Sequence, residues 1–277
     1  RQVARNLHKR KANGVLVKMD ISRAFDSMSW PFLFEVLRVK GFSERWRSLI
    51  ATLLSSASSR VIVNGSAGDK ILHACGLRQG DPISPLLFVI AMDALSALIV
   101  RAQVTGVLSP MPGCSSVQRL SIYTDDVVLF IRPTHMDLAF VKEVMHIFGE
   151  ASGLRINYQK SSANMIRPGV GDTERVAAAL PWRIQTFPCK YLSLQLSIKQ
   201  LTRNQWQPMV DAVLNFLPGW SRGLITRPGR LVLINSIVRA RPIHHLIVAN
   251  APKWALDSID RGCKAFFWAG SEEIHGG

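Results

Sequence analysis

The acidic pair Asp125 and Asp126 lies between two runs of strand-forming residues, "LSIY" and "VVLFI". A connection this short joins strands that run antiparallel, as a hairpin. A third apolar run, "VLVKMD", ends on Asp20 and also has strand character. If this strand pairs beside the hairpin, three carboxylates meet at one end of an antiparallel sheet.

Helix signals alternate with these strands. A Ser or Thr ahead of a stretch with helical periodicity can accept hydrogen bonds from the first free N–H groups of a helix. We therefore expect helices to begin at Ser29, Ser43, Ser84 and Thr134, the last of which closes at Gly153. Strands and helices mixed in this way predict an α+β region.

Weaker patterns assign several more segments. We expect a basic helix that closes at Gly14, two strands around the turn residues Asn64 and Gly65, and single strands over 154–161 and 191–198. Beyond residue 198, long helical patterns separated by Pro and Gly replace the alternation of strand and helix patterns. The chain is therefore expected to divide into an α+β region and a helical module.

The charge of the chain indicates a polyanionic partner. Lys and Arg total 34 against 19 Asp and Glu, a formal net charge of +15. Nucleic acid is the first expectation and an anionic membrane the second, and a basic but solvated surface is the alternative. The longest apolar run, "SPLLFVIAMDALSALIV", is interrupted by Asp93 and falls short of a spanning helix. We expect it to form a buried helix, with no membrane partner.

Adjacent carboxylates at a tight turn are costly unless a cation neutralises them. A divalent ion such as Mg²⁺ prefers carboxylate oxygens and keeps positions open for phosphate oxygens. With Asp20 as a third ligand, Asp125 and Asp126 could serve two-metal phosphoryl transfer. The alternative from these residues alone is a solvated hairpin turn, because Asp is common in turns.

Several motifs in order carry a resemblance to a known family. They are "KMDISRAFDSMSW" (18–30), "GLRQGDPISPLLFVIAMDALS" (76–96), "YTDDVVLF" (123–130), "SGLRINYQKS" (152–161) and "FPCKYLSLQLSI" (187–198). This set resembles reverse transcriptases, most of all those of non-LTR (LINE-type) retrotransposons of plants. The resemblance implies a right-hand polymerase with an antiparallel α+β palm and partial fingers over 1–198. A helical thumb is implied over 199–277.

The resemblance also implies roles for the acids and their neighbours. Asp20, Asp125 and Asp126 correspond to the family's catalytic, metal-binding triad, and the carbonyl of Ile21 to a further ligand. They are expected to bind two Mg²⁺ ions, for which Mn²⁺ can substitute. Phe25 corresponds to the aromatic residue that excludes a 2′-OH and so selects dNTP over rNTP. An ordinary core aromatic is the alternative for Phe25.

Other positions match the family's nucleotide and primer contacts. Gln79 and Gly80 correspond to the loop that packs on the new base pair, and Arg78 could contact phosphate or template. Lys160 falls where the family often has a lysine near the leaving pyrophosphate. A solvated lysine after a strand is the equal alternative. The primer grip is expected to begin at Tyr191 and Leu192.

Some features need separate expectations. Thr124 stands where these elements usually have Ala, and because Thr is small and β-branched we expect a strand to tolerate it. Ser193 and Gln195 stand where plant relatives usually have Gly and Pro, and Gly would allow a backbone angle that Ser resists. Asp26 is expected to form structural hydrogen bonds rather than to bind metal. The chain begins at Arg1, shortly before the first motif, so we expect an N-terminally truncated piece without upstream fingers.

The implied activity is that of an RNA-directed DNA polymerase, in which a primer 3′-OH attacks the α-phosphate of a dNTP and releases pyrophosphate. The implied partners are an RNA template, a DNA primer and dNTPs, within a ribonucleoprotein of the element RNA in nucleus and cytoplasm. One alternative is a catalytically inactive, nucleic-acid-binding remnant that lacks fingers. Another is an RNA-splicing factor like the group II intron maturases, against which the "LPGW" segment (217–220) argues.

Overall fold

The structure is a computed structural model of the chain, and it describes residues 2–112, 119–217 and 225–269. Packing divides the chain into two compact units that meet in the sequence between Cys189 and Lys190. The residues that follow this point group with the C-terminal helices and not with the sheet.

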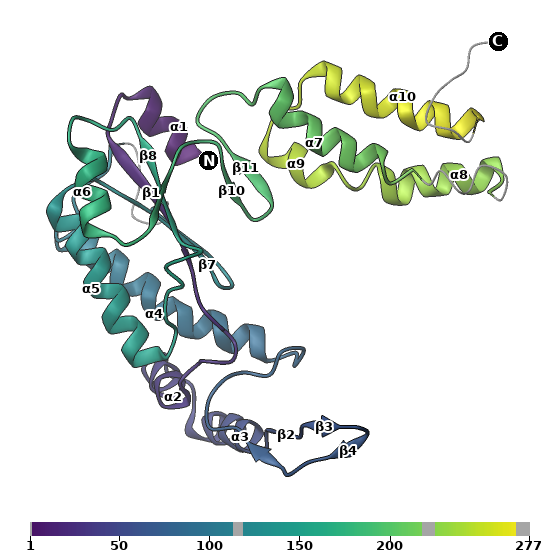
Figure 1. Ribbon diagram of the computed structural model, residues 1–277. Coiled ribbons are helices and arrows are strands. Elements are labelled where there is room, and N and C mark those ends of the chain that lie inside the picture. The colour runs from purple at the N-terminus through teal and green to yellow at the C-terminus, as the bar shows by residue number, and fades with distance from the viewer. Residues whose placement is uncertain (1, 113–118, 218–224, 270–277) are drawn as a thin grey trace. The chain divides into compact units, whose positions relative to one another are not determined.

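A five-stranded sheet forms the centre of the first unit, with the strand order β6-β7-β1-β8-β9 (Figure 1). Its strands are β1 (Gly14–Asp20), β6 (Leu120–Tyr123), β7 (Asp126–Ile131), β8 (Ser162–Ile166) and β9 (Arg183–Gln185). β1 runs antiparallel to both β7 and β8, and β9 is parallel to β8. The hairpin expected from the sequence is confirmed, and so is the pairing of β1 beside it.

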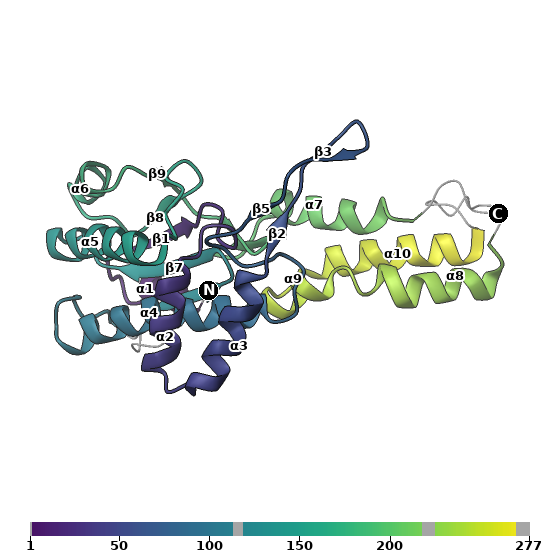
Figure 2. The ribbon, with the colours of Figure 1, turned by 90° about the horizontal axis from the view of Figure 1, so that it is seen from below.

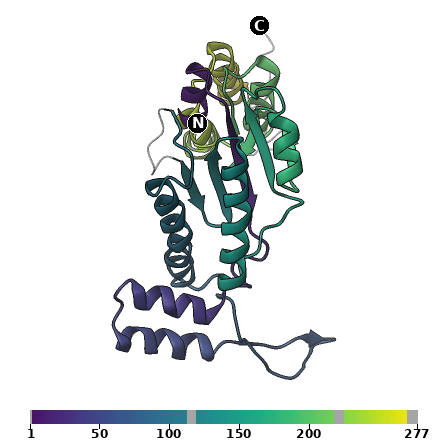
Figure 3. The ribbon, with the colours of Figure 1, turned by 90° about the vertical axis from the view of Figure 1, so that its left-hand side faces the viewer.

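Helices α4 (Ser84–Val104) and α5 (His135–Ser152) cover one face of this sheet, and Figure 3 shows them side by side in blue and teal. Strand alternation turns Val15, Val17 and Met19 of β1 toward that face, where they are buried with apolar residues of both helices. Each fully buried Val or Leu side chain stabilises the fold by roughly 1.5–3 kcal/mol. This packed layer anchors the strands whose ends carry the acids.

Three of the four expected helix starts are confirmed by their caps, whereas α4 begins at Ser84 without a side-chain cap. The hydroxyls of Ser29, Ser43 and Thr134 each accept a hydrogen bond from a main-chain N–H group at the start of a helix. These residues open α2 (Trp30–Val39), α3 (Glu44–Ser55) and α5, and Gly153 ends α5 with a φ of +78°. Two shorter helices, α1 (Gln2–Lys9) and α6 (Asp172–Ala179), also belong to this unit.

By length and composition alone, α4 could cross a membrane, as no other helix within the described ranges could. It extends over 21 residues and is therefore longer than the apolar run that we expected to fall short of a spanning helix. Phe88, Ala91 and Leu95 on one face are buried in the core, whereas Leu86 and Val89 are exposed. The expected burial of this helix is therefore confirmed for one face.

An arm follows α3 and carries short strand pairs (Figures 1 and 2). The pair next to the body is β2 (Ser58–Ser59) with β5 (Ile71–Leu72), and the pair at the tip is β3 (Ile62–Val63) with β4 (Ser66–Ala67). Asn64 and Gly65 form the turn, with φ of +49° and +84°. The expected turn is confirmed, although each of the two expected strands is broken in the middle.

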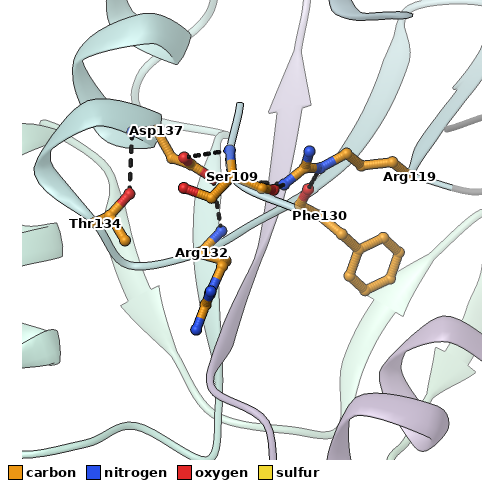
Figure 4. A network of polar contacts seen from close by, with 6 residues as sticks. All are labelled: Ser109, Arg119, Phe130, Arg132, Thr134 and Asp137. Carbon is orange, nitrogen blue, oxygen red and sulfur yellow. Dashed lines mark hydrogen bonds and ion pairs between the residues drawn. The ribbon is translucent and has the colours of Figure 1, made fainter. Parts of the chain in front are cut away.

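A buried ion pair fixes the β6–β7 hairpin at the end away from its turn (Figure 4). The guanidinium of Arg119 lies 3.4 Å from the carboxylate of Asp137, and both side chains are fully buried. Arg119 also donates to the carbonyls of Phe130 and Ser109, at 2.7 Å each. Asp137 accepts hydrogen bonds from the main-chain N–H groups of Ser109 and Arg132. The pair thereby joins the hairpin to the first turn of α5.

The second unit combines a hairpin with helices. The hairpin is β10 (Cys189–Tyr191) and β11 (Leu194–Leu196). The helices are α7 (Arg203–Leu214), α8 (Arg227–Leu233), the π-helical turn η3 (Ile234–Val238), α9 (Ile243–Val248) and α10 (Lys253–Ala269). Trp206, Val210, Val238 and Phe266 are among the residues of its core. Of the "LPGW" segment, residues 218–220 lie outside the described residues.

Two expectations about the first unit are wrong. α1 ends at Lys9, and Gly14 begins β1, while Lys11 takes the left-handed conformation with a φ of +54°. Residues 154–161 form no strand beyond an isolated bridge. The side chain of Asn157 accepts hydrogen bonds from the main-chain N–H groups of the second and third residues after it, and this turns the chain.

The expectation of a single strand over 191–198 is also wrong. Leu192 and Ser193 have φ of +49° and +63°, and they reverse the chain between β10 and β11. Ser193 therefore adopts a left-handed conformation that glycine allows. At this position the plant relatives that the sequence resembles usually have Gly.

Candidate active site

Strand pairing brings Asp20 and Asp126 together. They are direct partners in the β1–β7 ladder, as the last residue of β1 and the first of β7. Because directly paired residues point to the same face of a sheet, both carboxylates lie on one side. Asp125 precedes Asp126 in the turn, and its carbonyl accepts a hydrogen bond of 3.2 Å from the N–H of Ile21. The turn is thereby tied to the end of β1.

The turn before Asp125 carries backbone strain. Thr124 has a φ of +53°, which is an outlier for a β-branched residue. Thr124 lies in the turn between the strands, because β6 ends at Tyr123 and β7 begins at Asp126, so the suitability of Thr for a strand does not apply here. A left-handed residue other than glycine costs about 1–3 kcal/mol. The pairing of Tyr123 with Asp126 across the turn holds it in this conformation.

A cavity of about 650 Å³ lies beside these acids. Its lining includes eight of the residues selected from the sequence: Asp20, Ile21, Phe25, Arg78, Gln79, Gly80, Asp125 and Lys160. They come from the end of β1 and the loop after it, the loop before α4, the hairpin turn and the loop before β8. The volume falls in the range of roughly 300–1,000 Å³ that is usual for small-molecule sites.

Two lysines lie against two of the acids. The Nζ of Lys18 is 3.4 Å from Oδ1 of Asp126, and the Nζ of Lys160 is 4.0 Å from Oδ2 of Asp20. Burial raises the pKa of Asp20 above its ordinary value of 3.8. The charges of Asp125 and Asp126 also raise this pKa, whereas Lys160 and Lys18 oppose the rise. Sequence reasoning missed Lys18. This residue precedes Asp20 by two positions, so strand alternation places both on the same face of the sheet.

The acids supply the kind of donor atom that a divalent ion prefers, but their present arrangement does not form a metal site. Among the described residues, no group of three or more His, Cys, Asp or Glu side chains could hold a metal ion. The donors are carboxylate oxygens, which Mg²⁺ and Mn²⁺ prefer. Asp125 and Asp126 are close enough to act electrostatically on Asp20. In this arrangement the ammonium groups of Lys18 and Lys160 are the cations that lie against Asp126 and Asp20.

Phe25 faces both the cavity and the core. Its ring lines the cavity and stacks on Phe88 of α4, with ring centroids 4.9 Å apart and 21° between the planes. It is partly buried and packs against the core of the first unit. The surroundings of Phe25 therefore agree in part with a residue that selects the sugar and in part with a core aromatic. Phe88 supports the ring by stacking on it.

The loop before α4 presents polar residues beside the cavity. The Gln79 amide nitrogen donates to the carboxylate of Asp26 at 3.2 Å, which confirms the expected hydrogen-bonding role of Asp26. Gly80 has a φ of +91°, a conformation that a side chain would strain. Arg78 is exposed and lines the cavity.

Asn157 also lines the cavity, and sequence reasoning missed it. Its side-chain oxygen accepts a hydrogen bond of 3.3 Å from the N–H of Lys160, and its own N–H donates to the carbonyl of Asp20 at 2.8 Å. The hydroxyl of Ser161 accepts a hydrogen bond of 3.2 Å from the N–H of Asp20. These bonds attach the turn that carries Lys160 to the end of β1. Tyr191 and Leu192 belong to the β10–β11 region and not to this lining.

The sequence of this chain is similar to a known protein family and to proteins of transposable elements. The sequence matches the family described as "Reverse transcriptase (RNA-dependent DNA polymerase)" over residues 1–196. It is 26% identical over 272 residues to the "Transposon TX1 uncharacterized 149 kDa protein" of Xenopus laevis, which covers 94% of this chain and 20% of that protein. It is 31% identical over 118 residues to the Pol polyprotein of the retrotransposable element R2 of Popillia japonica, covering 41% of this chain and 18% of that protein.

The fold also has a solved counterpart. Telomerase from Candida tropicalis, in complex with a TWJ fragment of telomeric RNA, matches with a TM-score of 0.52 at 12% identity. The match covers 95% of this chain and 41% of that one. At this identity the likeness concerns the fold alone, and it confirms the expected α+β palm with a helical thumb. The chain spans about one fifth of the length of each of these two curated relatives.

Proposed function

Because this chain belongs to the reverse transcriptase (RNA-dependent DNA polymerase) family, we propose that it is the polymerase core of a non-LTR retrotransposon. In this proposal it extends a DNA primer on an RNA template with dNTPs. The observation that carries the proposal is the cavity of about 650 Å³ in which residues from separate loops meet beside Asp20 and Asp125. The activity, substrates and partners of the whole protein are part of the proposal, because its relatives are much longer.

The proposed reaction is nucleotidyl transfer. The primer 3′ oxygen forms a bond to the α-phosphorus of a dNTP, the bond from that phosphorus to the bridging oxygen breaks, and pyrophosphate leaves while the hydroxyl proton passes to water. We assign Asp20, Asp125 and Asp126, with the carbonyl of Ile21, to hold two Mg²⁺ ions, and Mn²⁺ can replace them. When bound, such ions favour ionisation of the attacking hydroxyl and neutralise the phosphates. The raised pKa of Asp20 supports this assignment, because an added cation would offset its unfavourable burial.

Other residues of the cavity position the nucleotide in this proposal. The ring of Phe25, supported by Phe88, blocks the space of a 2′-OH and so favours dNTP over rNTP. Gln79 and Gly80 pack on the new base pair. Arg78 contacts phosphate or template.

Charge and primer binding complete the proposed site. Lys160, held by the turn at Asn157, neutralises the leaving pyrophosphate. Tyr191 and Leu192 contribute the primer grip.

A second candidate is a protein that binds nucleic acid but does not extend a primer. The net charge of +15 supports binding in either case. The ion pairs of Lys18 with Asp126 and of Lys160 with Asp20 favour this candidate, since both cations occupy the carboxylates. An arrangement of that kind would hinder the binding of divalent ions if the lysines did not move.

The proposal also covers the type of retrotransposon and the cellular location of the protein. We propose a plant-type element, because the five motifs of the sequence resemble those of plant retrotransposons most of all. We also propose that the protein acts in a ribonucleoprotein with the element RNA in nucleus and cytoplasm. Its basic charge suits an RNA partner.

Primer extension tests the proposal. The purified chain and its Asp125→Ala variant are given poly(rA) with an oligo(dT) primer and dTTP, in Mg²⁺ and in Mn²⁺, and duplex binding is measured in parallel. The proposal predicts extension by the chain and none by the variant, with equal duplex binding. Tight binding without extension by the unaltered chain would establish the second candidate instead.

A further inference from the structure

The loop after β1 and the loop before α4 are joined by hydrogen bonds. The N–H of Leu77 donates to the carbonyl of Phe25 at 2.6 Å, and the N–H of Gly76 to the carbonyl of Met28 at 2.8 Å. The indole N–H of Trp30 donates to the carbonyl of Gly76 at 2.7 Å. These bonds hold the two loops in one register beside the cavity.

Gly76 makes this close approach feasible. Its φ is +85°, and a Cβ atom at this position would lie 2.6 Å from the carbonyl oxygen of Asp26. A side chain is therefore excluded both by its backbone conformation and by contact with the neighbouring backbone. The backbone of Asp26 is consequently fixed against the loop that carries Gln79.

The side chains of Asp26 and Gln79 meet across this junction. Nε2 of Gln79 lies 3.2 Å from Oδ1 of Asp26. An ionised carboxylate only accepts hydrogen bonds, so it selects the amide orientation in which nitrogen faces Asp26. The carbonyl oxygen of Gln79 then points away from Asp26. Gln79 lines the cavity and Asp26 does not.

We propose that Asp26 is a positioning residue that holds Gln79 so that its Oε1 is presented to the incoming nucleotide. This inference rests on the proposed function. A carbonyl oxygen can only accept, so the group that it meets on the nucleotide is a donor, either the sugar hydroxyl or an N–H of the base. Oε1 of Gln79 therefore does not bind the phosphates, whose oxygens are acceptors.

Kinetics test the positioning role with Asp26→Leu, Asp26→Asn and a control, Asp69→Asn, which changes an exposed carboxylate of the arm. Loss of one hydrogen bond predicts that Asp26→Leu raises KM for dTTP about fivefold with little change in kcat. Asp26→Asn keeps an acceptor and shows a smaller rise, and Asp69→Asn shows none. A fall in kcat at unchanged KM in Asp26→Leu overturns the proposal in favour of a structural role.

The same variants locate the donor on the nucleotide. If the donor is the sugar hydroxyl, Asp26→Leu loses selectivity for dTTP over 2′,3′-dideoxy-TTP. A raised KM with unchanged selectivity assigns the donor to the base. Raised KM values for both compounds without any effect of Gln79→Met would contradict the proposed path through Gln79.

A direct readout does not depend on activity. The side-chain amide resonances of Gln79, assigned by their loss in Gln79→Met, are recorded in ¹H–¹⁵N spectra of each variant. Asp26→Leu is predicted to shift them and to speed their hydrogen exchange, while Asp69→Asn leaves them unchanged. Unshifted resonances in Asp26→Leu overturn the proposal even if the chain is an active polymerase. Shifted resonances in an inactive chain support the Asp26 contact and leave only the proposed function contradicted.

Discussion

Asp20 and Asp126 face each other directly across the β1–β7 ladder, each at the end of its strand. Like charges at directly opposed positions destabilise a sheet. Lys18 and Lys160 reduce this repulsion, because each lies beside one of the two acids. The fold therefore keeps an unfavourable pair of like charges beside the cavity, and of the two acids Asp20 lines it.

The stability cost of Asp20 is testable by its pH dependence. Burial raises the folded-state pKa of Asp20 above 3.8, so the free energy of unfolding falls as pH rises from 3.8 to the raised pKa, and the loss persists at neutral pH. Asp20→Asn removes this loss. Urea unfolding should therefore show Asp20→Asn to be more stable than the unaltered chain at about pH 7, but hardly so at about pH 3.

The exposed Asp69→Asn variant is the control and should show no such difference between the two pH values. A gain for Asp20→Asn that is as large at the lower pH would contradict the burial of the charge as its cause.

Replacement of Phe25 tests the two interpretations of its ring. Phe25→Val opens space in the cavity and should increase the use of rNTP relative to dNTP. It also removes the stacking on Phe88 and should cost about 1–3 kcal/mol of unfolding free energy. Competitive incorporation of dTTP and UTP, with urea unfolding, measures both effects.

Phe32→Val is the matched control, since Phe32 is also partly buried but packs edge-to-face on Phe148 and does not line the cavity. It should lose stability and keep sugar selectivity. If Phe25→Val behaves in the same way as this control, Phe25 is a core residue and does not select the sugar.

The strained turn predicts a stabilising substitution. Asn tolerates the left-handed region better than Thr, so Thr124→Asn should raise the free energy of unfolding by about 1 kcal/mol. The same change at Thr105, which has a φ of −81°, should bring no gain. Chemical unfolding of both variants decides the matter, and equal effects at the two positions would refute a role of backbone strain.

The buried ion pair predicts a large loss. Asp137→Ala leaves the guanidinium of Arg119 buried without its carboxylate and should cost about 3–5 kcal/mol of unfolding free energy. Asp93→Ala breaks the more exposed pair with Lys40 and should cost no more than about 1 kcal/mol. Similar losses in both variants would show that burial does not set the strength of the Arg119 pair.

Local signals were sufficient for much of the fold. The capping hydroxyls of Ser29, Ser43 and Thr134 interact within one helical turn, so neighbouring residues reveal them. The acids could be placed together because they end strands whose pairing is limited by a short turn. The strands expected over 154–161 and 191–198 failed because propensity does not report a side-chain-stabilised turn at Asn157 or positive φ values at Leu192 and Ser193.

Contacts between distant segments lay beyond sequence reasoning. The hydrogen bond between Asp26 and Gln79 joins residues 53 positions apart, and no periodicity relates them. The ion pair between Lys18 and Asp126 depends on the register of β1 against β7. Alternation along β1 could have placed Lys18 on the face of Asp20, but not at Asp126.

In the proposed function, the opposed acids Asp20 and Asp126 act as one catalytic unit. We would measure primer extension on poly(rA) and oligo(dT) by the unaltered chain, by Asp20→Asn and Asp126→Asn, and by the double variant, with Asp69→Asn as control. Each single variant should lose on the order of a hundredfold or more in rate, and the double variant should lose little further. Extension by Asp20→Asn at the rate of the unaltered chain, or losses that multiply in the double variant, would contradict the claim.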